Sequence, residues 1–349
     1  MMRVLMAAGV YSLGGASTVI ENLADKLSKK GVDVTIGALK FKRTPSKAGC
    51  SVSTLPLHNV SKLKRFLNSF DVVHNHHPIT NYLALLNNKP FIYHFHGAPD
   101  FGMGNLYRFS MLSSIKMTGH RFDAVIAVSE SAAVEFRRYI DLSNVHVLYN
   151  GVDTNRFRSM REERYRRWKP QFLFVGNLYR HKKVEELIFA MKRLVNKYPK
   201  SYLQIVGNGC MYNHLKHLVI KLGLQSNVEL IGYVPIDELP YYYASCDVYV
   251  TASRWELFGL PLLEAMACGK PIVASSIPPH TELLTKSNAG ATYIIGNLND
   301  LLEKMIHVYE KADIYKDNVV AFAKAHDWSV VTERLLNIYT KLLRKNLND

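Results

Sequence analysis

The segment Glu256–Val273, with the sequence ELFGLPLLEAMACGKPIV, decides the fold of the chain around it. A short β-rich run at Val248–Val250 comes before it, and a second such run, Pro271–Ala274, overlaps its end. Between these runs, Leu260-Pro261 predicts the start of a helix, because proline is favoured in the first helical turn. A strand, a loop, a helix and another strand in this order indicate a parallel sheet crossed by helices.

The same alternation of short strands and helical segments extends in both directions from this segment. In the second half of the chain, further β-rich runs occur at Phe172–Val175, Tyr202–Val206 and Val228–Ile231. In the first half they occur at Val4–Ala7, Val32–Ile36, Asp71–His74, Phe91–Phe95, Ala124–Val128 and Val145–Leu148. The two series predict an α/β protein of two doubly wound domains, and 349 residues suit about two domains of ordinary size.

The boundary between the two series falls in the polar stretch Asp153–Pro170, in which seven cations accompany three acids. Such a charged stretch is typical of a linker. We therefore expect an N-terminal domain over residues 1–160 and a C-terminal domain over residues 161–328. Residues 329–349 predict a helix with an apolar face, which could close the second domain or cross back to the first.

The composition excludes several classes of protein. With 48% hydrophobic and 21% charged residues, the chain is neither disordered nor fibrous, and its apolar runs fall short of the roughly 20 residues that cross a bilayer. Four dispersed cysteines without a Cys-x-x-Cys pair indicate neither a disulfide framework nor a cysteine zinc site, and favour a reducing, cytoplasmic compartment. A net charge of +15 favours partners that carry phosphate or other anionic groups.

Open parallel sheets bind ligands at the carboxyl ends of their strands, so residues that follow strands are the first candidates for a site. Gly14-Gly15 follows the first strand and precedes a helix, which suits either a backbone site for an anion or an ordinary turn. Gly207-Asn208-Gly209 also follows a strand, but Tyr212 occupies the third glycine position of a dinucleotide fingerprint. We therefore do not expect a nicotinamide site.

Histidines cluster after two successive strands of the first half, at His74, His76, His77, His94 and His96. Imidazoles can bind zinc, but no carboxylate spacing supports a metal site here. We favour hydrogen-bonded polar groups, or one catalytic imidazole, over a metal. The sequence also lacks an Asp-x-Asp pair that would hold a magnesium diphosphate, so we expect no metal and no separate cofactor.

The segment Glu256–Val273 resembles the signature of the retaining glycosyltransferases called group 1, or family 4. In that signature a glutamate and a second glutamate are separated by seven residues, as Glu256 and Glu264 are here. Other stretches are similar to family elements too: Gly14-Gly15, His96-Gly97, Asn150–Asp153 and Val175–Lys182. The resemblance covers most of the chain and implies two Rossmann-like doubly wound domains facing each other across a cleft, the GT-B fold.

The resemblance also implies an activity, the transfer of a hexose from a nucleoside-diphosphate sugar to a hydroxyl of a glycan or lipid-linked acceptor, with retention and without a metal. His96 and Glu256 would be the catalytic residues near the reacting sugar, and Glu264 would hold the ribose. Tyr233 could lie near the base. The residues implied in binding the donor diphosphate are Gly14, Gly15, Asn177, Arg180, Lys182, Phe258, Gly259 and Leu260.

The chain departs from the family pattern at three positions. Asn177 stands where the family usually has arginine, a charge that Arg180 could supply. Lys183 follows Lys182 at a position where the family frequently has glycine, and Leu257 replaces a frequent glycine after the first glutamate. These departures concern diphosphate binding and the shape of the sugar pocket.

A second class of function stays open on the sequence alone, a catalytically inactive protein of this fold that binds anionic lipid or another polyanion. Residues Val34–Phe70 contain no acid and seven cations, Lys40, Lys42, Arg43, Lys47, Lys62, Lys64 and Arg65. This basic stretch predicts either peripheral contact with an anionic membrane, at its inner surface, or a solvated face. Nucleic acid is not expected as a partner, since no stacking pattern accompanies the charge.

Overall fold

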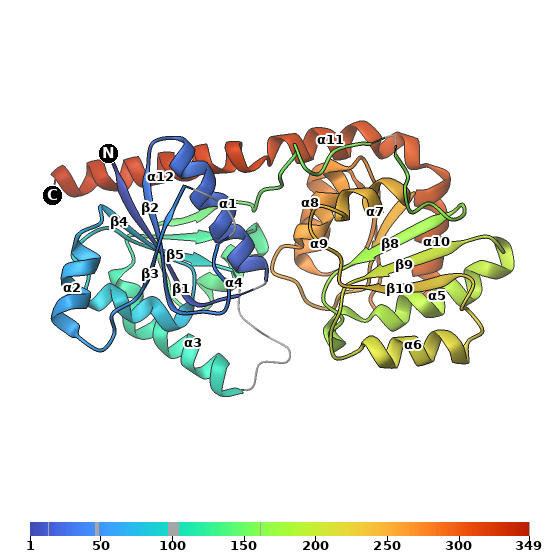
Figure 1. Ribbon diagram of the computed structural model, residues 1–349, viewed down its shortest axis with the longest axis horizontal. Helices are drawn as coiled ribbons and strands as arrows, with labels where there is room; N and C mark the ends of the chain where they lie inside the picture. Colours follow the sequence, from blue (N-terminus) through green and yellow to red (C-terminus); the bar gives the residue numbers. More distant parts are fainter. Residues whose placement is uncertain (13, 46–48, 97–104, 161, 349) are drawn as a thin grey trace. The chain divides into compact units, whose positions relative to one another are not determined.

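The computed structural model describes residues 1–12, 14–45, 49–96, 105–160 and 162–348, and it divides into two compact units (Figure 1). Unit 1 contains Met1–Gly151 and Trp328–Asp349, and unit 2 contains Val152–Asp327. The fold class is the predicted one, with two parallel α/β domains. The first boundary between the units lies between Gly151 and Val152, earlier in the chain than the expected boundary after residue 160.

The physical reason for this difference is a set of contacts that attach the start of the polar stretch to unit 2. The Val152 N–H donates to the His326 carbonyl at 2.9 Å, and the Thr154 hydroxyl donates to an Asp327 carboxylate oxygen at 2.6 Å. The stretch is thus a part of unit 2 and not a free linker. The helix predicted over 329–349 forms, and it belongs to unit 1.

In the described part of unit 1, a seven-stranded parallel sheet has the strand order β3-β2-β1-β4-β5-β6-β7. Its strands are β1 (Arg3–Tyr11), β2 (Asp33–Phe41), β3 (Ser51–Thr54), β4 (Val72–Asn75), β5 (Phe91–Phe95), β6 (Ala124–Ala127) and β7 (Val145–Val147). The helices are α1 (Gly15–Lys29), α2 (Val60–Asn68), α3 (Asn105–Thr118), α4 (Glu130–Arg137) and α12 (Trp328–Asn348), with 3-10 turns η1 (Pro78–Leu85) and η2 (Gly119–Arg121).

In unit 2, whose residues are described except for position 161, a six-stranded parallel sheet has the order β10-β9-β8-β11-β12-β13. Its strands are β8 (Gln171–Val175), β9 (Tyr202–Val206), β10 (Val228–Gly232), β11 (Val248–Thr251), β12 (Ile272–Ser275) and β13 (Gly290–Tyr293). The helices are α5 (Val184–Lys197), α6 (Tyr212–Lys221), α7 (Leu239–Ser245), α8 (Leu260–Ala267), α9 (Pro278–Ser287), α10 (Leu298–Glu310) and α11 (Lys316–Ala325), with 3-10 turns η3 (Arg180–Lys182) and η4 (Ala312–Tyr315).

The central strands are buried because helices cover the sheet faces, as their unbroken apolar sequences require. In β1, Val4, Leu5, Met6 and Ala7 are fully buried. The register pairs Met6 with His74 and Ala7 with Asn75, so two polar residues of β4 lie at the centre of the sheet. This placement puts polar side chains at the carboxyl ends of the strands of unit 1, where the chain leaves β4 and β5.

Helix α12 covers part of unit 1 and packs against α1; Figure 1 shows it in red. Its Val331, Leu335 and Tyr339 are buried, which accounts for the apolar face that the sequence predicts. An ion pair between Lys30 and Glu333, at 2.8 Å, joins the end of α1 to the same helix. Unit 1 is therefore built from two segments that are distant in sequence.

Candidate active site

Glu256 and Lys182 form the centre of the candidate site in unit 2. Lys182 ends the turn η3 after β8, and Glu256 lies in the loop after β11, the strand that pairs with β8. The Lys182 ammonium forms an ion pair with Glu256 Oε1, and the Ser253 hydroxyl donates to the same oxygen at 2.8 Å. The two side chains are only 16% and 18% exposed, so water screens this pair less than an ion pair on the open surface.

The charge of Glu256 follows from its surroundings. Burial by itself raises the pKa of this carboxyl, but the Lys182 ammonium, His280 and the hydrogen bonds from Lys182 and Ser253 outweigh burial. The net result is a pKa below the ordinary value for glutamate. Glu256 is thus an ionised hydrogen-bond acceptor at neutral pH, as a group that orients sugar hydroxyls needs to be.

Helix α8 begins directly after this loop, as the proline signal predicts. Its N-cap, Gly259, has a φ of +95°, a left-handed conformation in which a side chain would be strained. Pro261 occupies the first turn, and no side chain caps the helix start. Pro261 has no N–H, and the Leu262 N–H donates to the Gly259 carbonyl at 2.9 Å, so this turn offers an anion chiefly the positive end of the helix dipole.

Glu264 lies one turn inside α8, at the position expected from the sequence. Tyr243 of α7 donates a hydrogen bond from its hydroxyl to Glu264 Oε2 at 2.8 Å. Burial raises the pKa of Glu264 to about 7, although the Tyr243 hydrogen bond and Arg156 act in the opposite direction. The two glutamates of the signature therefore differ in charge near neutral pH.

The other predicted residues of unit 2 lie at strand ends but differ in exposure. Asn177 and Arg180 are exposed on the segment after β8 that leads to Lys182. Phe258 is 2% exposed, so its side chain belongs to the core and only its backbone could face a ligand. Tyr233 follows β10 and is 69% exposed. The structure joins Lys182 directly to Glu256, and the roles of the remaining residues stay predictions.

Two residues of this site were missed from the sequence, Ser253 and His280. His280, on α9, is fully buried; its Nδ1 lies 3.1 Å from the Ser275 carbonyl oxygen, and burial lowers its pKa to about 4. Its Nε2 has no hydrogen-bond partner among the described residues. Each residue follows the end of a strand, β11 or β12, and that position is the signal that could have indicated them.

In unit 1 the predicted histidine cluster exists, at the carboxyl ends of β4 and β5. His74 Nε2 lies 3.1 Å from His94 Nδ1, and His76 Nδ1 lies 3.1 Å from His96 Nε2. The rings of His94 and His96 are stacked, with centroids 4.4 Å apart and planes 5° from parallel. His74, His76 and His94 are buried and His96 is half-buried, so His96 is the member of these four that a substrate can best reach.

One nitrogen each from His74, His76 and His94 lies within 4.8 Å of the others, which raises the question of a metal. Ligands bonded to zinc at about 2.0–2.1 Å lie only about 3.3 Å apart around a tetrahedral ion. Both nitrogens of His74 already have partners, His94 Nδ1 and the Tyr339 hydroxyl, the latter at 2.6 Å. These contacts fit a hydrogen-bonded cluster, and the expected absence of a metal stays a prediction.

Two other predicted elements of unit 1 lie near strand ends. Gly14 is the N-cap of α1, which starts at Gly15, and no side chain caps this helix start. Both glycines are exposed, as a backbone site for an anion requires. Gly151 packs against Trp328, because a Cβ at this position would lie 2.6 Å from the indole ring. Gly97, which was predicted together with His96, lies outside the described residues.

Comparison with known families agrees with this geometry. A family model described as glycosyl transferases group 1 matches residues 155–325, and one described as glycosyltransferase family 4 matches residues 13–156. Together the two matches include nearly all of both units and all the signature residues. The chain belongs to the group 1, or family 4, glycosyltransferases.

Similar proteins cover almost the full chain. An uncharacterized glycosyltransferase of Methanocaldococcus jannaschii is 27% identical over 98% of this chain and 99% of its own. A phosphatidyl-myo-inositol mannosyltransferase of Propionibacterium freudenreichii is 29% identical over 80% of this chain and 73% of its own. Both relatives are glycosyltransferases by name, in agreement with the family.

Solved structures support the GT-B fold. Sucrose-phosphate synthase from Thermosynechococcus elongatus has a TM-score of 0.84 at 19% identity and covers 99% of this chain and 100% of its own. Anabaena HepE in complex with UDP and glucose has a TM-score of 0.80 at 17% identity, covering 98% of this chain and 100% of its own. Within the described residues, no helix is both long and apolar enough to span a bilayer.

Proposed function

We propose that this glycosyltransferase moves a hexose, mannose or glucose, from a nucleoside-diphosphate sugar to a hydroxyl of a glycan or lipid-linked acceptor. The observation that carries the proposal is the Lys182–Glu256 pair at the start of α8, with Glu264 one turn further on. The Lys182 cation and the positive end of helix α8 suit the diphosphate, and carboxylates suit the hydroxyls of the two sugars. The names of the mannosyltransferase relative and of the complex with UDP and glucose support this class of substrate.

The sugar donor would be held by groups of distinct chemistry. Lys182, Arg180 and the amides of Phe258, Gly259 and Leu260 would stabilise the diphosphate, with Asn177 and the Gly14-Gly15 turn as further contacts. Glu264 would accept hydrogen bonds from the ribose, and Tyr233 would lie near the base. The leaving diphosphate gains negative charge that must be neutralised. Lys182 would supply the positive charge that a bound magnesium ion supplies in other enzymes. We infer that transfer needs no metal.

The chemical step we propose is an attack on the same face from which the diphosphate departs. The bond between the anomeric carbon and the phosphate oxygen breaks, and the acceptor oxygen bonds to that carbon. The departing phosphate accepts the proton of the acceptor hydroxyl. Because attack and departure occur on the same face, the anomeric configuration is retained. Glu256 would orient the sugar through its hydroxyls, and His96 would contact a hydroxyl near the anomeric centre. No step requires a carboxylate nucleophile.

A donor screen tests the proposed function. Thermal stabilisation and sugar release are measured with UDP-, GDP- and ADP-sugars, each with and without a chelator. We expect one nucleotide sugar to stabilise the protein and to turn over in the presence of the chelator. Glu256→Gln should reduce turnover by roughly a hundred-fold or more, since the neutral amide loses charge-assisted hydrogen bonds to the sugar. Glu303→Gln, an exposed position on α10, is the matched control.

Each result of this screen has a defined meaning. Loss of activity on chelation would contradict the metal-independent mechanism but leave the transferase intact. A Glu256→Gln variant as active as the wild type would remove Glu256 from the site. If no nucleotide sugar stabilises the protein while anionic vesicles do, the catalytically inactive binding protein becomes the better description.

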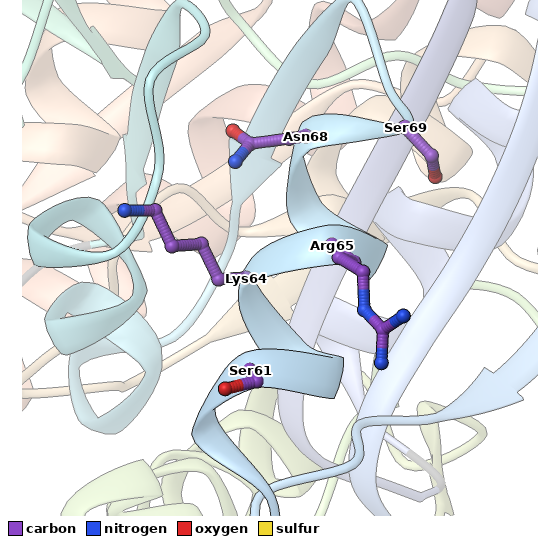
Figure 2. A pocket seen from close by; sticks show the side chains of 5 residues that line it. All are labelled: Ser61, Lys64, Arg65, Asn68 and Ser69. Carbon is purple, nitrogen blue, oxygen red and sulfur yellow. The ribbon is translucent and has the colours of Figure 1, made fainter.

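A basic surface on α2 favours a membrane-facing acceptor. Ser61, Lys64, Arg65, Asn68 and Ser69 line an open hollow of about 480 Å³ on this helix, and Figure 2 shows their side chains. Leu57 and Val60, just before and at the start of α2, are 51% and 60% exposed. Cations beside exposed apolar side chains suit the surface of an anionic bilayer. We therefore propose peripheral membrane contact as the route to a lipid-linked acceptor.

A further inference from the structure

The four imidazoles of unit 1 raise a question that the proposed function leaves open, namely how the ring of His96 is held and which of its nitrogens carries the proton. In a neutral imidazole one nitrogen donates a hydrogen bond and the other accepts one. His96 has a neighbour at Nε2, because His76 Nδ1 lies 3.1 Å away. Within the described residues its other nitrogen, Nδ1, makes no hydrogen bond, and we take it as the atom that meets a substrate.

The environment of His76 decides which ring donates in this hydrogen bond. His76 is 4% exposed, and its Nε2 has no partner among the described residues. If His76 donates from Nδ1, the buried Nε2 is a bare lone pair. If His76 accepts, the buried Nε2 must carry an unpaired N–H, and orphaned buried N–H groups are the rarer and costlier case. The first arrangement is favoured, and it places the proton of His96 on Nδ1.

We propose that His76 is a positioning residue that fixes His96 in the tautomer with its proton on Nδ1, so that His96 meets the substrate as a hydrogen-bond donor. This inference rests on the proposed function, in which His96 contacts the reacting sugar. A donor at this place polarises an oxygen near the anomeric centre and removes no proton from the acceptor. That role agrees with a mechanism in which the leaving phosphate accepts the proton.

The surrounding groups hold the ring in place and keep it neutral. The His94 ring stacks on His96, and His94 is joined through His74 to the buried hydroxyl of Tyr339 on α12. Among the described residues, the titratable side chains that interact with His96 are His76, His94, His77 and His74. Burial lowers the pKa of His96 to about 4, with His77 acting in the same direction. His96 is thus uncharged across the physiological range.

Two polar substitutions of His76 separate positioning from packing. In His76→Asn the side-chain amide lies at the same distance along the side chain as Nδ1 and can donate to His96. In His76→Gln the amide lies at the place of Nε2 and cannot. We expect His76→Asn to keep most of the wild-type kcat and His76→Gln to lose about a hundred-fold, with KM for the sugar donor nearly unchanged. His146→Gln, at a half-buried position on β7, controls for substitution of a histidine in this unit.

The acidic limb of the kcat–pH profile gives a second readout. The hydrogen bond from His76 stabilises the lone pair on His96 Nε2, and so it favours the neutral ring. Its loss in His76→Gln should raise the pKa of His96 and move the acidic limb to higher pH. In His76→Asn the limb should stay in place. A purely structural role for His76 would lower stability in both variants without separating the two profiles.

The tautomer itself is measured on the whole protein by ¹⁵N NMR of labelled histidine, with His96→Ala used to assign the signals. A protonated Nδ1 and a bare Nε2 on His96 are expected, and the reverse would overturn the proposal whether or not any variant is active. Equal kcat values for His76→Gln and the wild type would overturn it too. If His96→Ala is fully active while a nucleotide sugar still turns over, the role of His96 fails and the transferase stands. If no nucleotide sugar binds, the proposed function has failed.

Discussion

Glu256 and Glu264 stand eight positions apart in one segment, yet their surroundings set their charges differently. Glu256 receives a cation and a hydroxyl donor, which hold its pKa below the ordinary value. Glu264 faces the buried hydroxyl of Tyr243, and its pKa rises to about 7 through burial. One carboxylate is permanently charged at neutral pH and the other responds to small changes in pH.

This difference predicts that binding of the sugar donor depends on pH through Glu264. An ionised carboxylate accepts two ribose hydrogen bonds better than a protonated one, so affinity should rise as pH increases from about 6 to about 8. The hydrogen bond from Tyr243 favours the ionised form. Tyr243→Phe should therefore move the midpoint to higher pH. Calorimetric titration of the sugar donor across this range measures both effects.

Helix α7, which carries Tyr243, also provides a matched control, since its Tyr242 is buried and stacks on Tyr165. Tyr242→Phe should leave the midpoint where it is in the wild type. An affinity that is flat with pH in the wild-type protein would show that Glu264 does not hold the ribose.

At the residue scale, the sequence predicted those parts of the site that depend on local spacing. Glu256, Gly259, Pro261 and Glu264 lie in one continuous segment, so a loop followed by a helix is enough to place them. Ser253 and His280 were not assigned, because the Ser253 hydrogen bond to Glu256 and the electrostatic effect of His280 on it depend on where β11 and β12 end. The clustering of His74, His76 and His94 was predicted from the sequence. The hydrogen bond of His74 with Tyr339 was not, because Tyr339 lies 265 positions away in the chain.

At the scale of elements, α12 stabilises unit 1 through apolar burial and one buried polar contact. The Tyr339 hydroxyl pairs with His74 at 2.6 Å, and both side chains are fully buried. Burial raises the pKa of Tyr339 well above its ordinary value, so the hydroxyl keeps its proton and forms a neutral hydrogen bond with His74 Nδ1. This hydrogen bond connects the helix to the middle of the sheet.

Tyr339→Phe should lower the free energy of unfolding of unit 1 by about 1–3 kcal/mol, because it leaves His74 Nδ1 buried without its hydrogen-bond partner. Urea titration followed by circular dichroism measures the loss. Tyr309→Phe on α10 is the control, since the Tyr309 hydroxyl has no hydrogen bond within the described residues. Equal stability of the Tyr339 variant and the wild type would mean that another group satisfies His74.

The basic surface of α2 gives a prediction about membranes. Lys64→Glu combined with Arg65→Glu should abolish most binding to vesicles of anionic lipid, since each cation near such a surface contributes about 1 kcal/mol. Sedimentation with anionic and neutral vesicles at low and high salt measures the effect. Lys216→Glu combined with Lys221→Glu, on the exposed face of α6, makes the same change in net charge. If this control pair loses binding equally, general charge and not α2 is responsible.

The elements that sequence patterns missed are those without a buried apolar run. Strands β3 (Ser51–Thr54) and β13 (Gly290–Tyr293) each lie at one edge of their sheets, and their residues are mostly exposed or half-buried. An edge strand pairs on one side only, so its residues need not be apolar. The central strands were all predicted, because burial on both faces requires continuous hydrophobic sequence.

At the scale of the whole molecule, the chain forms two compact units, and the second is inserted into the first. The sequence indicated two domains through its repeated strand and helix order. It did not fix the first boundary, because a charged stretch such as Asp153–Pro170 looks the same whether it is a linker or part of a unit. Val152 and Thr154 form hydrogen bonds with His326 and Asp327, which directly follow α11 and are distant in sequence. These hydrogen bonds make the start of the charged stretch part of unit 2.

This division predicts that a fragment of residues 152–327 folds by itself, since it contains a complete sheet with its covering helices. A fragment of residues 1–151 should not fold stably, because it lacks the α12 residues that bury its apolar face. Adding a peptide of residues 328–349 should restore its structure. Circular dichroism and thermal melting of each fragment measure this, and a cooperative melt of residues 1–151 alone would contradict it.

The insertion of unit 2 also has a consequence for synthesis on the ribosome. Helix α12 is translated only after every residue of unit 2, so unit 2 can reach its final structure while unit 1 still waits for its covering helix. During that interval the nascent chain exposes the apolar surface of α1 and the histidines beneath Tyr339. A stop codon at position 328 would therefore release a chain in which unit 2 is complete and unit 1 lacks its covering helix, so that chaperones would have to bind unit 1.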